Sequence, residues 1–261
     1  MKITITDKKK KEIFVSLFNV LKNCSSLINV IFETELMHIQ GMDKSHICLF
    51  DVKLEKKWFA TYDILETIKI CFDAVFFYSI ISTKSDNQDL CIYLNDNNHD
   101  ILHIVFDSKE DKEAKKFEFK KTFKMNLTEY DYEEIVIPGA DYDAEFSLSS
   151  KLISYMFSQL SNFGDDIVMN CSEEQITLTT NGITGEMKID IPNDDLNNYS
   201  IIEDEQIILT YSLSYINKMC ITNKLSLDVE FSLSNQCPMK ISYNLEDDSS
   251  IVFFIAPKMN D

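Results

Sequence analysis

The chain has 261 residues, and 45% of them are hydrophobic, which is enough to bury a sizeable core in one large domain or two smaller ones. Its 43 acidic and 25 basic residues give a net charge of -18. This charge excludes binding of DNA through the general surface, although it allows a local basic stripe. Because all the basic residues are lysines, bidentate reading of guanine by arginine is also excluded.

No stretch of the sequence has the roughly 18 consecutive apolar residues of a membrane helix, and the N-terminal residues lack the apolar core of a secretory signal. We therefore expect an intracellular protein with no membrane partner. The seven cysteines are scattered and include no Cys-x-x-Cys pair. This spacing favours buried reduced thiols over disulfides or a zinc site.

Residues 7–24 predict an amphipathic helix that Asp7 caps at its N-terminus. Its apolar face comprises Ile13, Phe14, Leu17, Phe18, Val20, Leu21 and Cys24. Three strand-like runs follow, at residues 27–34, 36–43 and 46–54. A second, shorter helix at 72–84 precedes strands at 89–96 and 101–108. The first half of the chain therefore predicts two helices, each followed by antiparallel strands.

The second half of the chain repeats this order. A helix at 149–164 carries one apolar face, made of Ile153, Met156, Phe157, Leu160 and Phe163. Strands are predicted after it at 166–172, 174–182 and 185–191. A fourth helix at 212–224 precedes strands at 225–234, 238–247 and 250–258. The repeat indicates two similar α+β domains, each with two helices packed on antiparallel sheets.

A half-exposed strand is predicted between the two halves. In residues 116–127, the odd-numbered positions, on one face of the strand, include Phe117, Phe119, Phe123, Met125 and Leu127. The even-numbered positions, on the other face, include Lys116, Lys120 and Lys124. Lysines on such a strand suit the edge of a sheet. After Leu127 the alternation stops, which predicts an extended acidic connector ending at Pro138. We therefore predict an N-terminal domain at 1–126, a connector at 127–138 and a C-terminal domain at 139–261.

The sequence offers no catalytic motif. It contains no P-loop, no nucleophile elbow, no His-Glu-x-x-His and no glycine-rich dinucleotide loop, and it has only five glycines. Residues 96–107 mimic a calcium loop, but Ile101 occupies the position that needs glycine and Asp107 replaces the bidentate glutamate. His99 and His103 are more simply explained as hairpin residues than as metal ligands. We predict no enzyme, no metal site and no cofactor.

Three separated segments resemble the proliferating cell nuclear antigen (PCNA) family of eukaryotic and viral-type DNA sliding clamps. They are residues 36–49, LMHIQGMDKSHICL; residues 133–138, EEIVIP; and residues 237–261, CPMKISYNLEDDSSIVFFIAPKMND. The resemblance covers the chain from Lys8 to Asp261. It implies the DNA clamp (processivity) fold, with three chains closing head to tail into a ring around duplex DNA. It also implies that the strand around Phe123 meets the strand around Met187 of the next subunit.

The resemblance implies a peptide-binding groove as well. In the family, the loop matching residues 41–49, the end of the connector and the tail form a hydrophobic groove for client peptides with aliphatic and aromatic anchors. Carried over, the groove walls would be Met42, Ile47, Leu49, Ile135, Ile137, Pro138, Pro238, Phe254, Ala256 and Pro257, edged by His46, Lys258 and Met259. Exposed apolar residues of this kind suit an anchor site.

The four helices of a family member line the hole of the ring. The resemblance therefore implies that these lysines face DNA: Lys8, Lys9, Lys10, Lys11, Lys22, Lys84, Lys151, Lys218 and Lys224. They are fewer than the family pattern has, so we expect weak affinity for open DNA and retention by the topology of the ring. The connector departs from the family too, because it is rich in tyrosine and has Val136 where the family usually has a small residue.

Taken together, the residues and the resemblance predict a DNA polymerase processivity factor without chemistry of its own. Its expected partners are double-stranded DNA of any sequence, a DNA polymerase and other replication or repair clients, an ATP-dependent clamp loader, and further copies of itself in a homotrimer. Its expected location is the nucleus, or a cytoplasmic replication site if it is viral. Two alternatives stay open: a specialised clamp (a checkpoint-clamp subunit or a viral monomeric or dimeric factor), or a client-binding scaffold that does not encircle DNA.

Overall fold

The computed structural model describes residues 1–95, 98–108 and 119–258 of the chain. Contacts between residues divide the chain into two compact units. Unit 1 comprises Met1–Gly41, Asp51–Ile135 and Leu245–Ser250, and unit 2 comprises Met42–Phe50, Val136–Asn244 and Ile251–Asp261. Each unit thus takes a short segment from the other half of the sequence. The division at residues 126 and 138 remains a prediction from the sequence.

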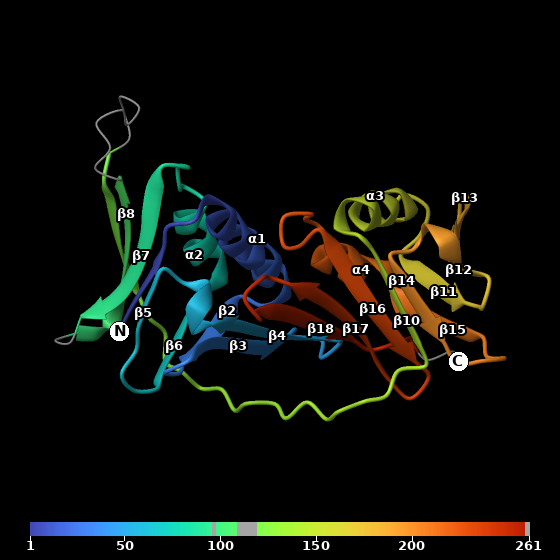
Figure 1. Cartoon of the computed structure of the whole chain (residues 1–261), viewed down its shortest axis with the longest axis horizontal. Coiled ribbons are helices and arrows are strands. Elements are labelled where there is room, and N and C mark those ends of the chain that lie inside the picture. The colour runs from blue at the N-terminus through green and yellow to red at the C-terminus, as the bar shows by residue number, and fades with distance from the viewer. Residues whose placement is uncertain (96–97, 109–118, 259–261) are drawn as a thin grey trace. The chain divides into compact units, whose positions relative to one another are not determined.

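Unit 1 contains two α-helices and two groups of strands (Figure 1). The helices are α1 (Lys8–Cys24) and α2 (Ala74–Ile81), with a 3-10 turn η1 (Lys56–Trp58). Its strands are β1 (Lys2–Ile5), β2 (Leu27–Phe32), β3 (Leu36–Met42), β4 (Cys48–Glu55), β5 (Thr61–Asp63), β6 (Ile68–Asp73), β7 (Gln88–Asn95), β8 (Asn98–Ser108) and β9 (Lys121–Asn126). They are ordered β5-β1-β7-β8-β9 in one group and β4-β3-β2-β6 in the other. Strand β4 is divided between the two units.

Unit 2 repeats this plan. Its helices are α3 (Ser150–Leu160) and α4 (Leu213–Met219), with a 3-10 turn η2 (Asn193–Asp195). Its strands are β10 (Ala144–Ser149), β11 (Asp166–Cys171), β12 (Gln175–Gly182), β13 (Gly185–Pro192), β14 (Asn198–Ile201), β15 (Ile207–Ser212), β16 (Asp228–Ser234), β17 (Cys237–Asn244) and β18 (Ser250–Ile255). They are ordered β14-β10-β16-β17-β18 and β13-β12-β11-β15. The four predicted helices and the repeated α+β plan are therefore confirmed.

Helix α1 begins and packs as its sequence predicts. The side chain of Asp7 accepts a hydrogen bond of 2.8 Å from the backbone N–H of Lys10, which satisfies a donor that the first helical turn leaves open. The predicted apolar face is buried along the whole helix. In Figure 1, α1 and α2 lie side by side over the strands of unit 1. The apolar spacing therefore fixes which side of α1 is left for solvent.

The core of unit 1 is an aromatic cluster centred on Phe18 and Phe77, with Trp58, the only tryptophan of the chain, at its edge. The ring of Phe18 lies 5.0 Å from that of Phe14 and 4.6 Å from that of Phe77, and Phe77 lies 4.5 Å from Phe72. Trp58 is 1% exposed, and its ring lies 6.3 Å from Phe14. Tilted and edge-to-face contacts of this kind stabilise a core beyond the area that they bury. Helices and strands of unit 1 meet in this cluster.

Helix α3 supplies the matching core of unit 2. Four of its five predicted apolar positions are buried. The ring centroid of Phe157 lies 6.0 Å from that of Phe231 on β16. The fifth, Phe163, is 40% exposed, so its predicted place on the buried face is wrong. The reason is that α3 ends at Leu160, three residues earlier, and helical spacing no longer applies beyond it.

The connector is tied to unit 1 by one glutamine. Gln40 of β3 donates a hydrogen bond of 2.9 Å to the carbonyl of Ile135 and accepts one of 2.7 Å from its N–H. The hydroxyl of Tyr132 donates to the same Gln40 oxygen at 2.9 Å. Gln40 is 5% exposed. Its side-chain amide bonds to both backbone groups of Ile135, as a neighbouring strand would. Apart from a single bridge at Thr128, the backbone has no helix or strand between Asn126 and Ala144, and the end of the connector at Pro138 remains a prediction.

A buried histidine–carboxylate pair lies beside this glutamine. Nε2 of His38 is 2.6 Å from Oδ1 of Asp51, and its Nδ1 is 3.7 Å from a carboxylate oxygen of Glu134 in the connector. Burial alone would raise the pKa of Asp51. The hydrogen bond and charge of the His38 ring, helped by Lys53 and Gln40, nevertheless hold it below its ordinary value. This network therefore stabilises the ionised form of Asp51.

Phe18→Ala should lower the free energy of unfolding by about 3–5 kcal/mol, because it empties the centre of the aromatic cluster. Denaturant titrations followed by the fluorescence of Trp58 would measure this loss. Phe76→Ala on α2 removes an equally large side chain that is 51% exposed, and it should change stability by less than about 0.5 kcal/mol. Equal effects of the two changes would contradict the described core.

Asp51→Asn should destabilise the protein at neutral pH and progressively less as the solution is acidified. A lowered pKa in the folded state gives stability that is present above the ordinary pKa of 3.8 and lost as pH falls through the folded value. The difference in unfolding free energy between the two proteins should therefore begin to shrink below about pH 5 and continue to shrink as the pH falls through the lowered pKa of Asp51. His38→Gln keeps a hydrogen-bond donor to Asp51 but removes the charge, so the unfolding free energy of this variant should depend less on pH over this range than that of the parent protein. A difference that is constant with pH would contradict the pairing.

Candidate functional site

The loop between β3 and β4 is organised by one carboxylate. Oδ1 of Asp43 accepts hydrogen bonds from the N–H groups of Ile47 (2.8 Å) and Cys48 (2.6 Å), and Oδ2 accepts one from Ser45 (2.8 Å). The hydroxyl of Tyr215 on α4 donates to Oδ2 at 3.1 Å. Burial would raise the pKa of Asp43, but these four donors lower it on balance. The loop therefore has a fixed shape, within which His46 adopts a positive φ of 57°.

The tail of the chain is joined to this loop within unit 2. The N–H of Ala256 donates to the carbonyl of Ile47 at 3.0 Å. Two residues later, the N–H of Lys258 donates to the carbonyl of Thr210 on β15 at 2.8 Å, and its Nζ lies 2.6 Å from a carboxylate oxygen of Asp166 on β11. The Ala-Pro-Lys segment is therefore held at both ends and lies against the loop.

The strands beside the loop turn apolar side chains away from the core. Cys48 points inward, since its sulfur lies 4.0 Å from that of Met219, and the hydroxyl of Tyr243 donates to the carbonyl of Met219. Because side chains alternate along a strand, Leu49 of β4 and Phe254 of β18 point to the opposite side, where both are half-buried. The sequence β17-β18-β4 places these strands next to one another. An apolar surface thus lies on the face of the sheet that α4 leaves uncovered.

The predicted groove residues fall in different parts of the structure. Unit 2 contains most of them, partly or fully exposed: Met42, His46, Ile47, Leu49, Ile137, Pro138, Pro238, Phe254, Ala256, Pro257 and Lys258. Ile135 belongs to unit 1, where Gln40 holds it, and Met259 lies outside the described residues. Direct bonding joins Ile47 to Ala256. Reasoning from the sequence missed Asp43 and Tyr215, although an aspartate directly after Gly41-Met42 is a common loop-forming signal.

The lysines at the start of α1 are occupied by acidic partners or buried. Nζ of Lys8 lies 2.7 Å from a carboxylate oxygen of Asp86, whose other oxygen is 3.9 Å from Lys84. Lys9 pairs with Glu246, and Lys10 pairs with Asp247. The hydrogen bond and charge of Asp86 raise the pKa of Lys8. These lysines are therefore not freely available to a phosphate.

Lys11 does not face solvent, so the prediction that it faces DNA is wrong. Its side chain is 0% exposed, and its Nζ donates to the carbonyls of Asp86, at 3.0 Å, and Gln88. A buried ammonium group needs such partners, because its desolvation would otherwise be costly. Lys11 therefore ties α1 to the start of β7.

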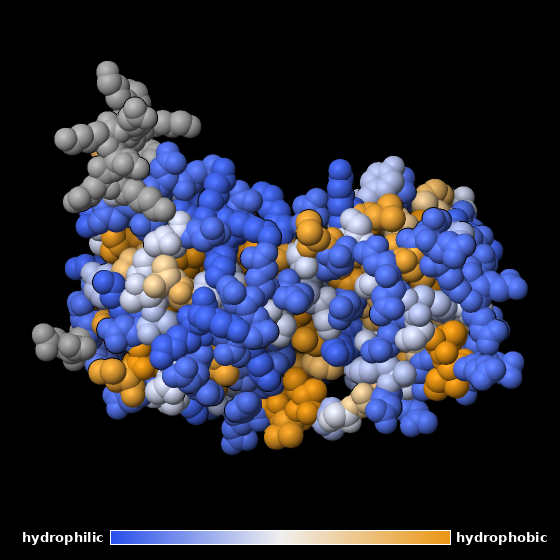
Figure 2. Space-filling view, in the orientation of Figure 1, coloured by the Kyte–Doolittle hydropathy of each residue, from blue (hydrophilic) through white to orange (hydrophobic). Residues whose placement is uncertain are grey.

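The other predicted DNA-facing lysines lie on surfaces that are partly aromatic. Nζ of Lys22 is 3.8 Å from the ring centroid of Tyr78 on α2, and Nζ of Lys218 is 5.0 Å from that of Tyr215. Lys151 and Lys224 are exposed. On α3, hydrophobic side chains reach the surface beside Lys151, including Leu152 at 44% and Tyr155 at 61% exposure, and Figure 2 shows hydrophobic colour in that region.

The two strands predicted to meet between subunits are both last in their sheets. Strand β9 follows β8 at one end of its sheet, with Phe123 half-buried and Lys124 exposed. Strand β13 is the outermost neighbour of β12, with Met187 half-buried between exposed Glu186 and Lys188. Each strand therefore presents backbone donors and acceptors that could pair with another strand. The start of the predicted edge strand, residues 116–118, lies outside the described residues.

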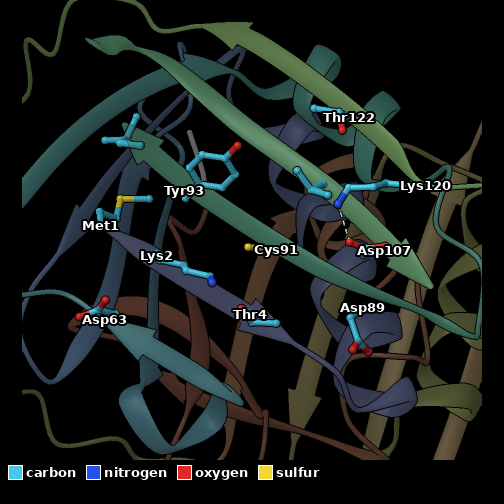
Figure 3. Close-up of a pocket in the computed structure, with 12 residues that line it drawn as sticks. Met1, Lys2, Thr4, Asp63, Asp89, Cys91, Tyr93, Asp107, Lys120 and Thr122 are labelled. Carbon is cyan, nitrogen blue, oxygen red and sulfur yellow. Dashed lines mark hydrogen bonds and ion pairs between the residues drawn. The ribbon is translucent and has the colours of Figure 1, made fainter. Parts of the chain in front are cut away.

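A cavity of about 630 Å³ lies on the face of the β5-β1-β7-β8-β9 sheet that points away from the core (Figure 3). It is lined by Met1 and Tyr93 on one side and by the ion pair of Lys120 and Asp107 on the other. No group of three or more metal-ligating side chains occurs among the described residues. All seven cysteines are free, and none of the described helices is long and apolar enough to span a membrane.

Comparison with known proteins matches this architecture to one family. The family model of the proliferating cell nuclear antigen N-terminal domain matches residues 7–134, and that of the C-terminal domain matches residues 136–258. The chain is 25% identical over 231 residues to the proliferating cell nuclear antigen of Chaetomium thermophilum, which covers 85% of each protein. It is 24% identical over 259 residues to proliferating cell nuclear antigen 2 of Plasmodium falciparum, covering 96% of this chain and 97% of that protein.

Both domains of the family are therefore present, in order, over nearly the whole chain. The resemblance carried by residues 36–49, 133–138 and 237–261 is confirmed, as is the α+β fold with two helices in each domain. The chain belongs to the proliferating cell nuclear antigen family of non-enzymatic DNA sliding clamps.

Proposed function

We propose that the chain is a DNA polymerase processivity factor that forms a homotrimeric ring around duplex DNA and tethers replication and repair proteins. The observation that carries this proposal is the joined loop and tail of unit 2, in which Ile47 bonds to Ala256 beside an outward-facing apolar surface. A surface of half-buried apolar side chains with a fixed backbone suits the anchors of a client peptide, because little order has to be created on binding.

In this proposal the groove comprises the predicted residues that unit 2 contains, from Met42 to Lys258. Ile47, Leu49 and Phe254 provide the apolar floor, and the exposed prolines and Ala256 provide its walls. Asp43 and Tyr215 act indirectly, since they fix the loop that presents Ile47. Client peptides with one aliphatic and one aromatic anchor match such a surface.

Ring closure would join β9 of one chain to β13 of the next. The backbones of two edge strands can pair, and Phe123 and Met187 would meet across the contact. The net charges on the two strands are opposite, because β9 carries Lys121 and Lys124 without an acid, whereas β13 carries two acids, Glu186 and Asp190, and one lysine, Lys188, which pairs with Asp190. An isologous dimer through β9 alone would bring lysines together. The charge pattern thus favours head-to-tail closure over a twofold dimer.

The remaining predicted partners follow from a closed ring. Duplex DNA of any base sequence would pass through the ring and contact the exposed lysines of the helices. An ATP-dependent loader would have to open the ring. The nucleus, or a cytoplasmic replication site if the protein is viral, would be its location. A specialised clamp is the second candidate, because several of the lysines predicted to face DNA are held by acidic side chains.

Ile47→Ser or Phe254→Ser should weaken binding of a labelled client peptide by at least about tenfold, since each change removes an apolar anchor contact. Fluorescence anisotropy would measure the affinity, and light scattering should show an unchanged assembly. Leu227→Ser, at an 81% exposed position of unit 2, is the matched control and should bind as the parent does. Unchanged binding in both groove variants would show that the peptide site lies elsewhere.

Light scattering over a concentration series should give the mass of three chains at physiological salt. Phe123→Glu should reduce this to one chain, because it removes an apolar contact and adds an acid opposite the acidic strand β13. Leu65→Glu, at a position that is 90% exposed, should leave the trimer intact. A mass of one or two chains for the unmodified protein would rule out an autonomous ring and favour the specialised clamp.

A further inference from the structure

The turn between β17 and β18 is built of three consecutive acidic residues in an uncommon conformation. Glu246, Asp247 and Asp248, here called the acidic loop, have φ values of 72°, 50° and 59°. Positive φ is uncommon for residues other than glycine, and each such residue has a cost that surrounding interactions must offset. Three in succession therefore indicate that neighbouring groups impose the shape of the turn.

Both ends of the acidic loop are anchored inside unit 1. The indole N–H of Trp58 donates to the carbonyl of Leu245 at 2.7 Å. The backbone N–H of Glu55 donates to the hydroxyl of Ser249 at 2.9 Å, and Leu245 and Ser249 bond to each other at 2.8 Å. Leu245 is 0% exposed and Ser249 is 1% exposed. The buried ends therefore hold the turn in place and leave its three carboxylates at the surface.

Each carboxylate of the acidic loop meets a different lysine. Glu246 pairs with Lys9, Asp247 with Lys10 and Asp248 with Lys57. Nζ of Lys10 also donates to the carbonyl of Trp58 at 2.9 Å.

The ionisation of these groups reflects the pairing. The hydrogen bond from Lys10 holds the pKa of Asp247 below its ordinary value. The hydrogen bond between Lys57 and Asp248 raises the pKa of Lys57. The three lysines thus form a basic cluster whose charge is matched one for one by the acidic loop.

We propose that the acidic loop is an intramolecular substitute for DNA phosphates, which occupies Lys9, Lys10 and Lys57 and so weakens the contact of this helix end with DNA. The inference rests on the proposed function, since it concerns how the same lysines meet DNA. To form a phosphate contact, each lysine must first leave a carboxylate. The gain in binding is then smaller than for a free lysine, which exchanges only mobile counterions.

The surface exposure of two of the pairs makes their exchange for a phosphate easy to reverse. The side chains of Glu246, Asp247 and Asp248 are 46%, 41% and 82% exposed, and those of Lys9 and Lys57 are 63% and 57% exposed, whereas that of Lys10 is 18% exposed. Exposed ion pairs contribute little stability and are screened by salt, so a nearby phosphate can compete with them. Lys57 was not among the lysines predicted to face DNA, and the acidic loop places it in the same cluster as Lys9 and Lys10.

The test compares the parent protein with the triple variant E246Q/D247N/D248N. The amides keep the size of the side chains, and asparagine tolerates positive φ. The matched control is E203Q/D204N/E205Q in unit 2, which changes the net charge equally and also includes a residue of positive φ, Asp204. Binding of a short fluorescein-labelled linear duplex would be measured by anisotropy over a series of salt concentrations.

The loop variant should bind the duplex about tenfold more tightly at low salt. A plot of its log association constant against log salt concentration should have a slope that is steeper by roughly 2 to 3, about one unit for each released lysine. The control should bind as the parent does. Equal affinities of the loop variant and the control would overturn the inference, because only net charge would then matter. Failure of all three proteins to bind at the lowest salt would also overturn it, since released lysines would make no contact.

A second measurement is independent of DNA. Brief acetylation with acetic anhydride, followed by mass spectrometry, should show faster modification of Lys9, Lys10 and Lys57 in the loop variant than in the parent or the control. Unchanged reactivity would overturn the inference even if DNA binding became tighter. The proposed ring is judged separately, by the mass of the assembly, so loss of the acidic-loop inference and loss of the ring remain distinguishable.

Discussion

The loop beside the apolar surface of unit 2 depends on the carboxylate of Asp43. Four hydrogen-bond donors converge on it and fix the loop that follows. One consequence is that Cys48 enters the core beside Met219 while Ile47 keeps its carbonyl free for Ala256. A neutral side chain could not satisfy four donors equally well, because an ionised carboxylate accepts stronger hydrogen bonds from more directions. The apolar surface proposed for client peptides is therefore supported by a buried charge that is not itself part of that surface.

The same dependence on long-range polar contacts recurs in unit 1. Gln40 replaces a missing strand partner for Ile135, and Trp58 holds the turn at Leu245 through its indole N–H. Both are nearly completely buried, so their polar groups have no solvent to bond with if these contacts are lost. Segments without regular structure thus keep a defined path because single buried side chains satisfy their backbone.

Local patterns in the sequence were sufficient for the helices and most of the strands, since both depend on the spacing of apolar residues. Six strands were missed. Three of them, β1, β5 and β14, have only three or four residues, which carry too little alternation to be distinguished from loops. The other three, β6, β10 and β15, have six residues each and lie directly before a helix, so their apolar residues run into the helical pattern. Lys11 was wrongly predicted to face DNA, although it precedes Phe14 and Phe18 by three and seven positions and so lies on the same face of the helix. By contrast, the pairing of Lys9 with Glu246 joins residues 237 positions apart, and no local pattern reports such a contact.

The net charge of the chain bears on how a clamp can stay on DNA. A protein with a net charge of -18 repels DNA at long range, and the ion pairs at the start of α1 reduce the local attraction further. For a protein that grips DNA by contact this combination would be a defect. The ring proposed for this chain would be retained by its topology instead, so every additional phosphate contact would slow its movement without being needed to hold it. In that ring, the proposed exchange of lysines between carboxylates and phosphates would keep each DNA contact brief, which suits a clamp that slides while the proposed groove stays available to clients.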